Sequence, residues 1–245
     1  MVCGNAPLPA STPSTAMVPV PPAASSLTAQ GALAAVLALI AGYVDAYTFL
    51  NYQVYGSFMS GNTTQTGLHA GQGGFAAAGY NLLPIPLFVA GVFAGALIWH
   101  SGLAQRSRWI FGLVAGLLAL GLAAVAPGPL PGWFGIIVLS LAMGIMNTTV
   151  TRVGDQSVSL GYVSGTLNNL AQHLALAVKG VPLSHAEGPR DTHLRRAGLL
   201  AGIWTAFVIG ALLAGAATPN FAAWSLLLPI LILSVLAIRG RPFRT

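Results

Sequence analysis

Six long apolar runs follow one another along most of the chain, with short polar stretches between them. They cover residues 31–50, 83–103, 110–127, 132–151, 197–216 and 221–238. A helix needs about 20 apolar residues to cross the hydrocarbon core of a bilayer, and each run is close to that length. The pattern therefore predicts an all-α, multi-pass membrane protein with six transmembrane helices.

Composition agrees with a membrane protein and excludes an ordinary soluble domain. Of the 245 residues, 55% are hydrophobic and 6% are charged, whereas about 25% of the residues in a typical soluble domain are charged. The net charge of +6 does not indicate nucleic-acid binding, because the basic residues lie in short groups between apolar runs. The lipid bilayer is the predicted partner, and no nucleic-acid partner is expected.

The basic residues set the expected orientation of the spans. They are Arg106, Arg108, Arg152, Lys179, Arg190, Arg195, Arg196, Arg239, Arg241 and Arg244. Loops rich in Lys and Arg stay in the cytoplasm, and six spans with both termini inside place all ten residues there. Eight spans would force either Arg106 with Arg108 or the cluster 179–196 outside, so we favour six.

The six-span topology has a consequence for two semi-apolar stretches, 51–82 and 152–196. Each must begin and end on one side of the membrane although it is long enough to enter it, which predicts two re-entrant segments. Residues 31–238 then form a single transmembrane domain, and 239–245 form a basic cytoplasmic tail. Residues 1–30, rich in Pro, Ser, Thr and Ala, are expected to be a disordered cytoplasmic tail.

The second half of the chain repeats polar features of the first half in the same order. Gly-Tyr-Val-Asp at 42–45 matches Gly-Ile-Met-Asn at 144–147, and the segment 58–63 matches 162–167. The glycines at 91 and 95 are matched with those at 198 and 202. The two units, 31–127 and 132–238, each contain three spans, so the second copy must run through the membrane in the opposite direction. This predicts an inverted 3+3 repeat.

Four strings in the chain carry a family resemblance. They are Ala-Gly-Tyr-Val-Asp-Ala-Tyr at 41–47, Ser-Phe-Met-Ser-Gly-Asn-Thr-Thr-Gln at 57–65, Ala-Met-Gly-Ile-Met-Asn at 142–147 and Tyr-Val-Ser-Gly-Thr at 162–166. In these strings the chain resembles the YoaK family of bacterial inner-membrane proteins, the domain of unknown function 1275. The resemblance implies a multi-pass protein of the bacterial plasma membrane. It implies no activity, catalytic residue or ligand.

Asp45 is the one acidic residue within a predicted span, and it admits two interpretations. An ionised carboxylate at the centre of a span costs about 2.5 to 3.5 kcal/mol, so it needs a partner or water. As a functional group it would be a proton or cation site facing a cavity. As a structural group it would cap the backbone of the re-entrant segment that follows.

The matched Ser-Gly segments also admit two interpretations. Glycine lets the backbone turn, and the polar side chains satisfy amides freed at a helix break. The N-terminal amides of the following half-helix could hold an anion or a polar solute, or the segment could be an N-cap that binds nothing. The candidate substrate-binding residues are Asp45, Ser60, Gly61, Asn62, Thr63, Gln65, His69, Asn147, Ser164, Gly165, Thr166, Asn169 and His173.

Histidines accompany both segments. Gln65 with His69, and Asn169 with His173, lie four positions apart and share a helix face. Two histidines without cysteines or paired carboxylates make a poor metal site, so we expect a polar lining and neither a metal nor a cofactor. Another histidine, His193, lies in a charged stretch that is expected to be a solvated loop.

A membrane enzyme is an alternative function, in which Ser60 or Ser164 would act with a histidine. The glycine two positions before the serine of intramembrane serine proteases is replaced by Phe58 and Tyr162, and hydrolase, phosphate-loop and dinucleotide motifs are missing. We therefore expect a channel or secondary transporter for a small polar solute or ion, with its site near the midplane where the re-entrant segments meet. A non-transporting scaffold is a third possibility, and the Gly-x-x-x-Gly faces allow a homo-oligomer.

Overall fold

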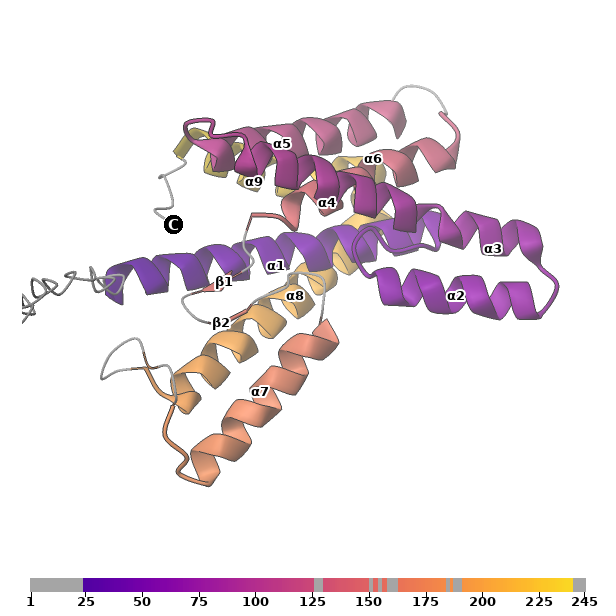
Figure 1. Cartoon of the computed structure of the whole chain (residues 1–245). Coiled ribbons are helices and arrows are strands. Elements are labelled where there is room, and N and C mark those ends of the chain that lie inside the picture. The colour runs from indigo at the N-terminus through magenta and orange to yellow at the C-terminus, as the bar shows by residue number, and fades with distance from the viewer. Residues whose placement is uncertain are drawn as a thin grey trace, which may run out of the picture.

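The computed structural model describes residues 24–125, 130–149, 152–153, 156–157, 163–183, 186 and 191–239. Helices dominate these residues (Figure 1). They are α1 (Ala24–Tyr52), α2 (Met59–Gly71), α3 (Phe75–Leu82), α4 (Pro84–His100), α5 (Arg106–Val125), α6 (Gly132–Met146), α7 (Val163–Val178), α8 (His193–Phe221), the 3-10 helix η1 (Ala222–Leu226) and α9 (Leu227–Arg239). Two-residue strands β1 (Arg152–Val153) and β2 (Gln156–Ser157) pair antiparallel between α6 and α7.

The prediction of a helical membrane protein is confirmed. Within the described residues, four helical stretches are long and apolar enough to cross a membrane: Ala29–Tyr52, Phe75–His100, Arg106–Ala123 and His193–Arg239. Helix α6 is apolar but shorter. The last stretch has 47 residues and contains a break, because Ala222 has a φ of 47° between α8 and η1.

Several predicted boundaries differ from the observed helices. Helix α1 begins at Ala24, so the prediction of disorder is wrong for residues 24–30; Pro22 is the last proline there, and the Ala, Leu and Gln that follow are good helix formers. The second span begins at Phe75 rather than 83, because α3 continues into α4 through Leu83 in a helical conformation. Residues 1–23 of the predicted tail and residues 240–245 lie outside the described residues.

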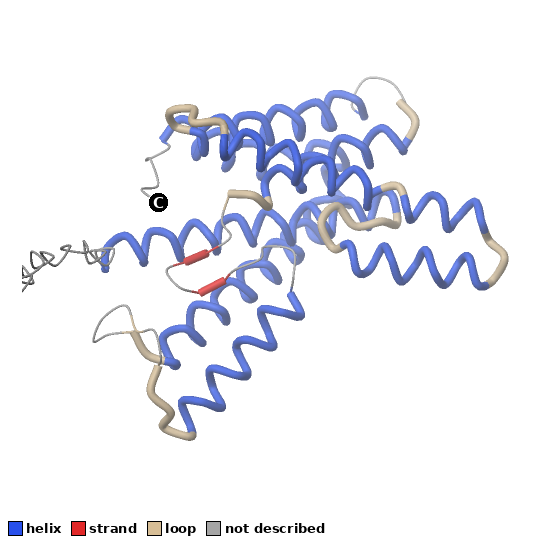
Figure 2. Tube along the Cα trace, in the orientation of Figure 1, coloured by secondary structure: helices blue, strands red, loops and turns tan. Residues whose placement is uncertain are grey.

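The helices form two crossing pairs, and α5 and α9 pack beside them. Helix α1 packs along α8, α4 packs on α6, and α5 packs against both α6 and α9. The shared core contains side chains of α1, α5 and α6, among them Leu37, Phe111 and Met143. The α2–α3 hairpin and helix α7, which packs against α8, extend from this bundle in different directions (Figure 2).

Glycines allow backbone contact at both crossings. A Cβ added to Gly42 of α1 would overlap the carbonyl oxygen of Phe207, and one added to Gly210 of α8 would overlap that of Leu39. At the α4–α6 crossing, a Cβ added to Gly144 would overlap the carbonyl oxygen of Phe88. These contacts bring the helix axes closer than larger residues permit.

One predicted glycine correspondence is wrong. A Cβ added to Gly91 or Gly95 would meet the backbone of α6, and at Gly95 also the side chain of Thr148, but no described atom lies within 4 Å of a Cβ added to Gly198 or Gly202. Gly210, further along α8, meets α1 instead. The sequence contains 30 glycines, and their spacing alone does not identify the one that lies at a crossing.

Two arginines in the first turn of α5 donate hydrogen bonds to the C-terminal ends of α4 and α9. The guanidinium group of Arg108 donates to the carbonyl oxygens of Ala237 (2.7 Å) and Ile238 (2.9 Å) at the end of α9. Arg106 donates to the carbonyl oxygen of Trp99 (3.0 Å) near the end of α4 and lies 4.7 Å from the centre of the Trp99 ring. Cations at helix C-termini are stabilising, so these ends of α4 and α9 are held at one end of the bundle.

Candidate functional site

Asp45 lies in α1 and is hydrogen-bonded to the loop that precedes α2. Its side chain is 3% exposed, and its Oδ1 and Oδ2 accept hydrogen bonds from Ser57 N (2.6 Å) and Ser57 Oγ (2.7 Å). One turn further, the hydroxyl of Thr48 accepts a hydrogen bond from Gly56 N (3.0 Å). Gln53, with a φ of 56°, reverses the chain between α1 and this loop. The side chains at the end of α1 thus fix the loop's backbone.

Asn62, in the first turn of α2, holds the same loop from its other end. Its Oδ1 accepts from Tyr55 N (2.9 Å) and its Nδ2 donates to Tyr55 O (2.8 Å), so the fully buried amide satisfies the backbone of one residue. The Tyr55 ring stacks on Phe49 and meets the edge of Phe58. A Cβ added to Gly61 would overlap the Phe58 ring. Gly61 and Asn62 of the Ser-Gly-Asn string therefore shape the entry to α2.

This geometry favours the structural interpretation of Asp45 over the functional one. Both carboxylate oxygens accept hydrogen bonds from one residue of the loop, as expected of a group that caps the backbone between α1 and α2. Ser57 was not among the candidate residues, although it lies in the first position of the string 57–65. We therefore assign Asp45 and Asn62 to positioning of α2.

The remaining candidates on α2 line a helix that is largely exposed. The hydroxyl of Thr63 donates to Met59 O (2.8 Å) within the same helix. Ser60 is exposed, while Gln65 and His69 are half-buried. These side chains take no part in the hydrogen bonds between Asp45 and the loop, so they remain accessible to a solute.

In the second half, the candidates divide between α6 and α7. Asn147 is half-buried at the end of α6. On α7, Ser164 is exposed, Gly165 and Asn169 are half-buried, and Thr166 is buried. The residue that matches Asp45 is thus an amide at a helix end, and the α7 counterparts of Ser60 and Gln65 have similar exposure.

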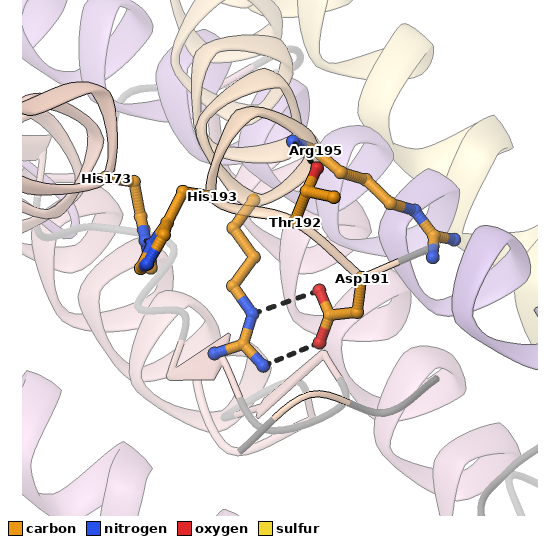
Figure 3. Close-up of polar contacts among 6 residues, drawn as sticks. His173, Asp191, Thr192, His193 and Arg195 are labelled. Carbon is orange, nitrogen blue, oxygen red and sulfur yellow. Dashed lines mark hydrogen bonds and ion pairs between the residues drawn. The ribbon is translucent and has the colours of Figure 1, made fainter. Parts of the chain in front are cut away.

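His173 of α7 contacts His193, the first residue of α8. Their Nδ1 atoms lie 2.8 Å apart, within hydrogen-bond distance, and their ring centres are 5.1 Å apart (Figure 3). His193 is 9% exposed, so the prediction that it lies in a solvated loop is wrong. The sequence held one signal for this: Thr192 is an N-cap residue and accepts a hydrogen bond from Arg195 N (3.2 Å).

The histidine contact lies beside an ion pair. Arg196 donates to both carboxylate oxygens of Asp191, at 3.2 and 2.7 Å, as Figure 3 shows. Helix α7 is not among the candidate membrane spans. Burial is the main cause that lowers the pKa of His173, and the nearby His193 and Arg196 lower it further. At neutral pH the His173 ring is therefore uncharged, and one ring of the pair can donate to the other.

The structure does not pack the two predicted re-entrant segments on one another. Helix α2 packs against α3 and α4, while α7 packs against α8. The two histidines predicted as symmetric, His69 and His173, lie in these separate hairpins. Within the described residues, no group of three or more His, Cys, Asp or Glu side chains is arranged to hold a metal ion.

Comparison with known proteins places most of the chain in one family. Residues 33–239 match the family described as "Protein of unknown function (DUF1275)". The UPF0700 transmembrane protein YoaK of Bacillus subtilis (strain 168) is 25% identical over 211 residues, which cover 82% of this chain and 89% of YoaK. The UPF0700 transmembrane protein RA0705 of Rhizobium meliloti (strain 1021) is 30% identical over 150 residues, which cover 61% of this chain and 64% of RA0705. No solved structure matches the chain.

Proposed function

The chain belongs to the DUF1275 family of integral membrane proteins, and we propose that it is a channel or secondary transporter for a small polar solute or ion. In this proposal the chain is an inverted repeat of two three-span units in the bacterial inner membrane, with both termini in the cytoplasm. Many transporters are built from such repeats and bind their solute at the repeat interface.

The observation that carries the proposal is the likeness of the two helix crossings. Helix α1 of the first unit meets α8 of the second at Gly42 and Phe207, and α6 of the second unit meets α4 of the first at Gly144 and Phe88. Gly42 and Gly144 are matched positions of the repeat. Their partners lie in similar strings, Phe-Val-Ala-Gly at 88–91 and Phe-Val-Ile-Gly at 207–210. Such an exchange between units supports a two-fold relation within the membrane.

The solute site belongs, in this proposal, to the accessible polar side chains of α2 and α7. Asp45 and Asn62 are left out of it because their hydrogen bonds hold the backbone of the entry loop. The accessible polar candidates on the two helices are Ser60, Thr63, Gln65, His69, Ser164, Asn169 and His173. Since the hairpins lie apart in this conformation, a transport cycle would bring their solute-facing sides together or open them in turn.

The proposed topology predicts which side of the membrane each turn faces. In a Cys3→Ser background, a single cysteine at Gln72, in the α2–α3 turn, should react with an impermeant maleimide in intact cells. Single cysteines at Leu103 and Lys179 should react only after permeabilisation, because the arginine-rich loops stay inside. All three positions are exposed. Labelling of Lys179→Cys in intact cells would contradict the inverted arrangement.

The transport proposal predicts solute flux that depends on both hairpins. Proteoliposomes should swell faster than protein-free liposomes in a gradient of at least one of glycerol, urea and potassium acetate, or should acidify trapped pyranine under a proton gradient. Gln65→Leu and Asn169→Leu should each slow that flux about tenfold, equivalent to about 1.4 kcal/mol on the barrier. Gln72→Leu, at an exposed turn, is the matched control.

The two alternative functions predict different results in the same variants. An enzyme would depend on one serine, so Ser60→Ala and Ser164→Ala would have unequal effects on hydrolysis of an added ester and none on flux. A scaffold would give liposomes that behave as protein-free ones with every probe. Flux that is unchanged in both Gln65→Leu and Asn169→Leu would remove α2 and α7 from the solute path.

A further inference from the structure

A cavity opens at the start of α5, away from the α2 and α7 hairpins. Its volume is about 650 Å³, and it is lined by Ala104, Gln105, Arg108, Trp109, Gly112 and Leu113. Arg108, Trp109, Gly112 and Leu113 recur at spacings of three and four, so they form one face of the first turns of α5. Ala104 and Gln105 lie in the turn that precedes the helix. The cavity is therefore a groove along the first turns of α5, where two arginines, Arg106 and Arg108, lie.

The far end of the groove is apolar and faces outward. Trp109 is 61% exposed and Leu113 is 41% exposed. Gly112 leaves the floor open, because the nearest atom to an added Cβ is the Cβ of Ala237, at 4.0 Å. Tryptophan favours the boundary between headgroups and hydrocarbon, which places the groove at that depth in the bilayer.

The near end of the groove carries a fixed positive charge. Arg108 donates to the end of α9 and to the side chain of Gln105, so three of its five N–H groups hold it in place and two remain for a ligand. Two further arginines add positive charge: Arg106 in the first turn of α5, and Arg239, which follows the Ile238 that accepts a hydrogen bond from Arg108. The segments 99–113 and 227–245 contain no Asp or Glu, so the charge at this end is uniformly positive.

We propose that this groove binds one anionic phospholipid of the surrounding bilayer. The phosphate would accept hydrogen bonds from Arg108 and Gln105, the glycerol would lie at Trp109, and one acyl chain would follow Gly112 and Leu113. A free phosphate ion would leave the apolar part of the groove empty, and a zwitterionic lipid would bring its own cation toward the arginines. Basic pockets at the cytoplasmic ends of transmembrane helices suit anionic headgroups for these reasons.

The test compares variants that fill the groove with a control on the same helix. Purified wild type, Gly112→Leu, Trp109→Ala and Gly116→Leu are mixed in detergent with phosphatidylglycerol or phosphatidylcholine, and bound lipid is counted by native mass spectrometry. The leucine at 112 fills the acyl path and leaves Arg108 and the groups that accept its hydrogen bonds unsubstituted. Gly116 lies one turn further along α5, outside the cavity lining, and no described atom lies within 4 Å of its added Cβ.

We expect the wild type and Gly116→Leu to retain one phosphatidylglycerol and to melt at a higher temperature with it than with phosphatidylcholine. Gly112→Leu and Trp109→Ala should bind it about tenfold more weakly, the effect of losing about two buried methylene groups. Equal retention of both lipids, or equal retention by Gly112→Leu and the wild type, would overturn the proposal. So would protection by inorganic phosphate alone, or a native mass showing that a second copy of the chain covers the groove.

Discussion

Substituting Gly42 or Gly144 with alanine will destabilise the protein by about 3 kcal/mol, toward the upper end of the range for overpacked sites. The added methyl group overlaps a backbone carbonyl oxygen, that of Phe207 or Phe88, and the backbone of a packed helix cannot rotate away as a side chain can. For a chain of this size we expect the melting temperature in detergent to fall by about 6 to 12 °C.

The control for these variants has the opposite expected sign. Gly198→Ala and Gly202→Ala place a methyl group where no described atom lies within 4 Å, and alanine restricts the unfolded chain. Each should stabilise the protein by about 0.4 to 1 kcal/mol. The melting temperatures of the four variants are compared, with melting monitored by size-exclusion chromatography. Similar shifts at all four positions would show that the α1–α8 and α4–α6 crossings are looser than described.

Removing the Asp45 carboxylate will cost about 3 kcal/mol or more of folding free energy. Asp45→Ala leaves the N–H and O–H of Ser57 buried without their partner, and each lost bond to a charged group costs about 1.5 to 3 kcal/mol. Asp45→Asn keeps one acceptor oxygen and should cost clearly less. The measurement is again the melting temperature of the purified protein.

A double-mutant cycle separates the positioning role of Asp45 from a transport role. If the carboxylate acts on the loop through Ser57, the double variant Asp45→Ala, Ser57→Ala should be at least about 1 kcal/mol more stable than the sum of the two single changes predicts. A proton-coupling site would behave differently: Asp45→Asn would keep the wild-type melting temperature and lose proton flux in proteoliposomes. That second outcome would return Asp45 to the solute path.

The apolar runs predicted the helices well because burial in a bilayer requires long uninterrupted hydrophobic segments. Their contacts were harder to predict. Gly210 meets α1 and Gly198 does not, yet both lie in the same apolar helix; the difference depends on where the helices cross, which local sequence does not encode. The same limit explains why the glycine match between the units was wrong.

The polar residues show a similar division. Helix α2 begins beside the Ser-Gly-Asn string, but its N-cap is Phe58, which makes no side-chain cap hydrogen bond. The partner of Asp45 depends on a chain reversal at Gln53, a residue with positive φ that is not glycine. His193 lies four residues before its predicted apolar run, beside charged neighbours, and those charges suggested solvent. Its burial follows from the packing of α7 on α8, a contact between two helices that sequence periodicity does not describe.

The pairing of α1 with α8 also has a consequence for biosynthesis. Gly210 follows Gly42 by 168 residues, and ribosomes add about 5 to 20 residues per second. Helix α1 therefore waits in the bilayer for about 10 to 30 s before its partner is made, with the backbone at its glycine face unshielded. During that interval its polar groups must be covered by lipid headgroups, water or the insertion machinery, and a nascent chain that stops before Phe207 never gains its native cover.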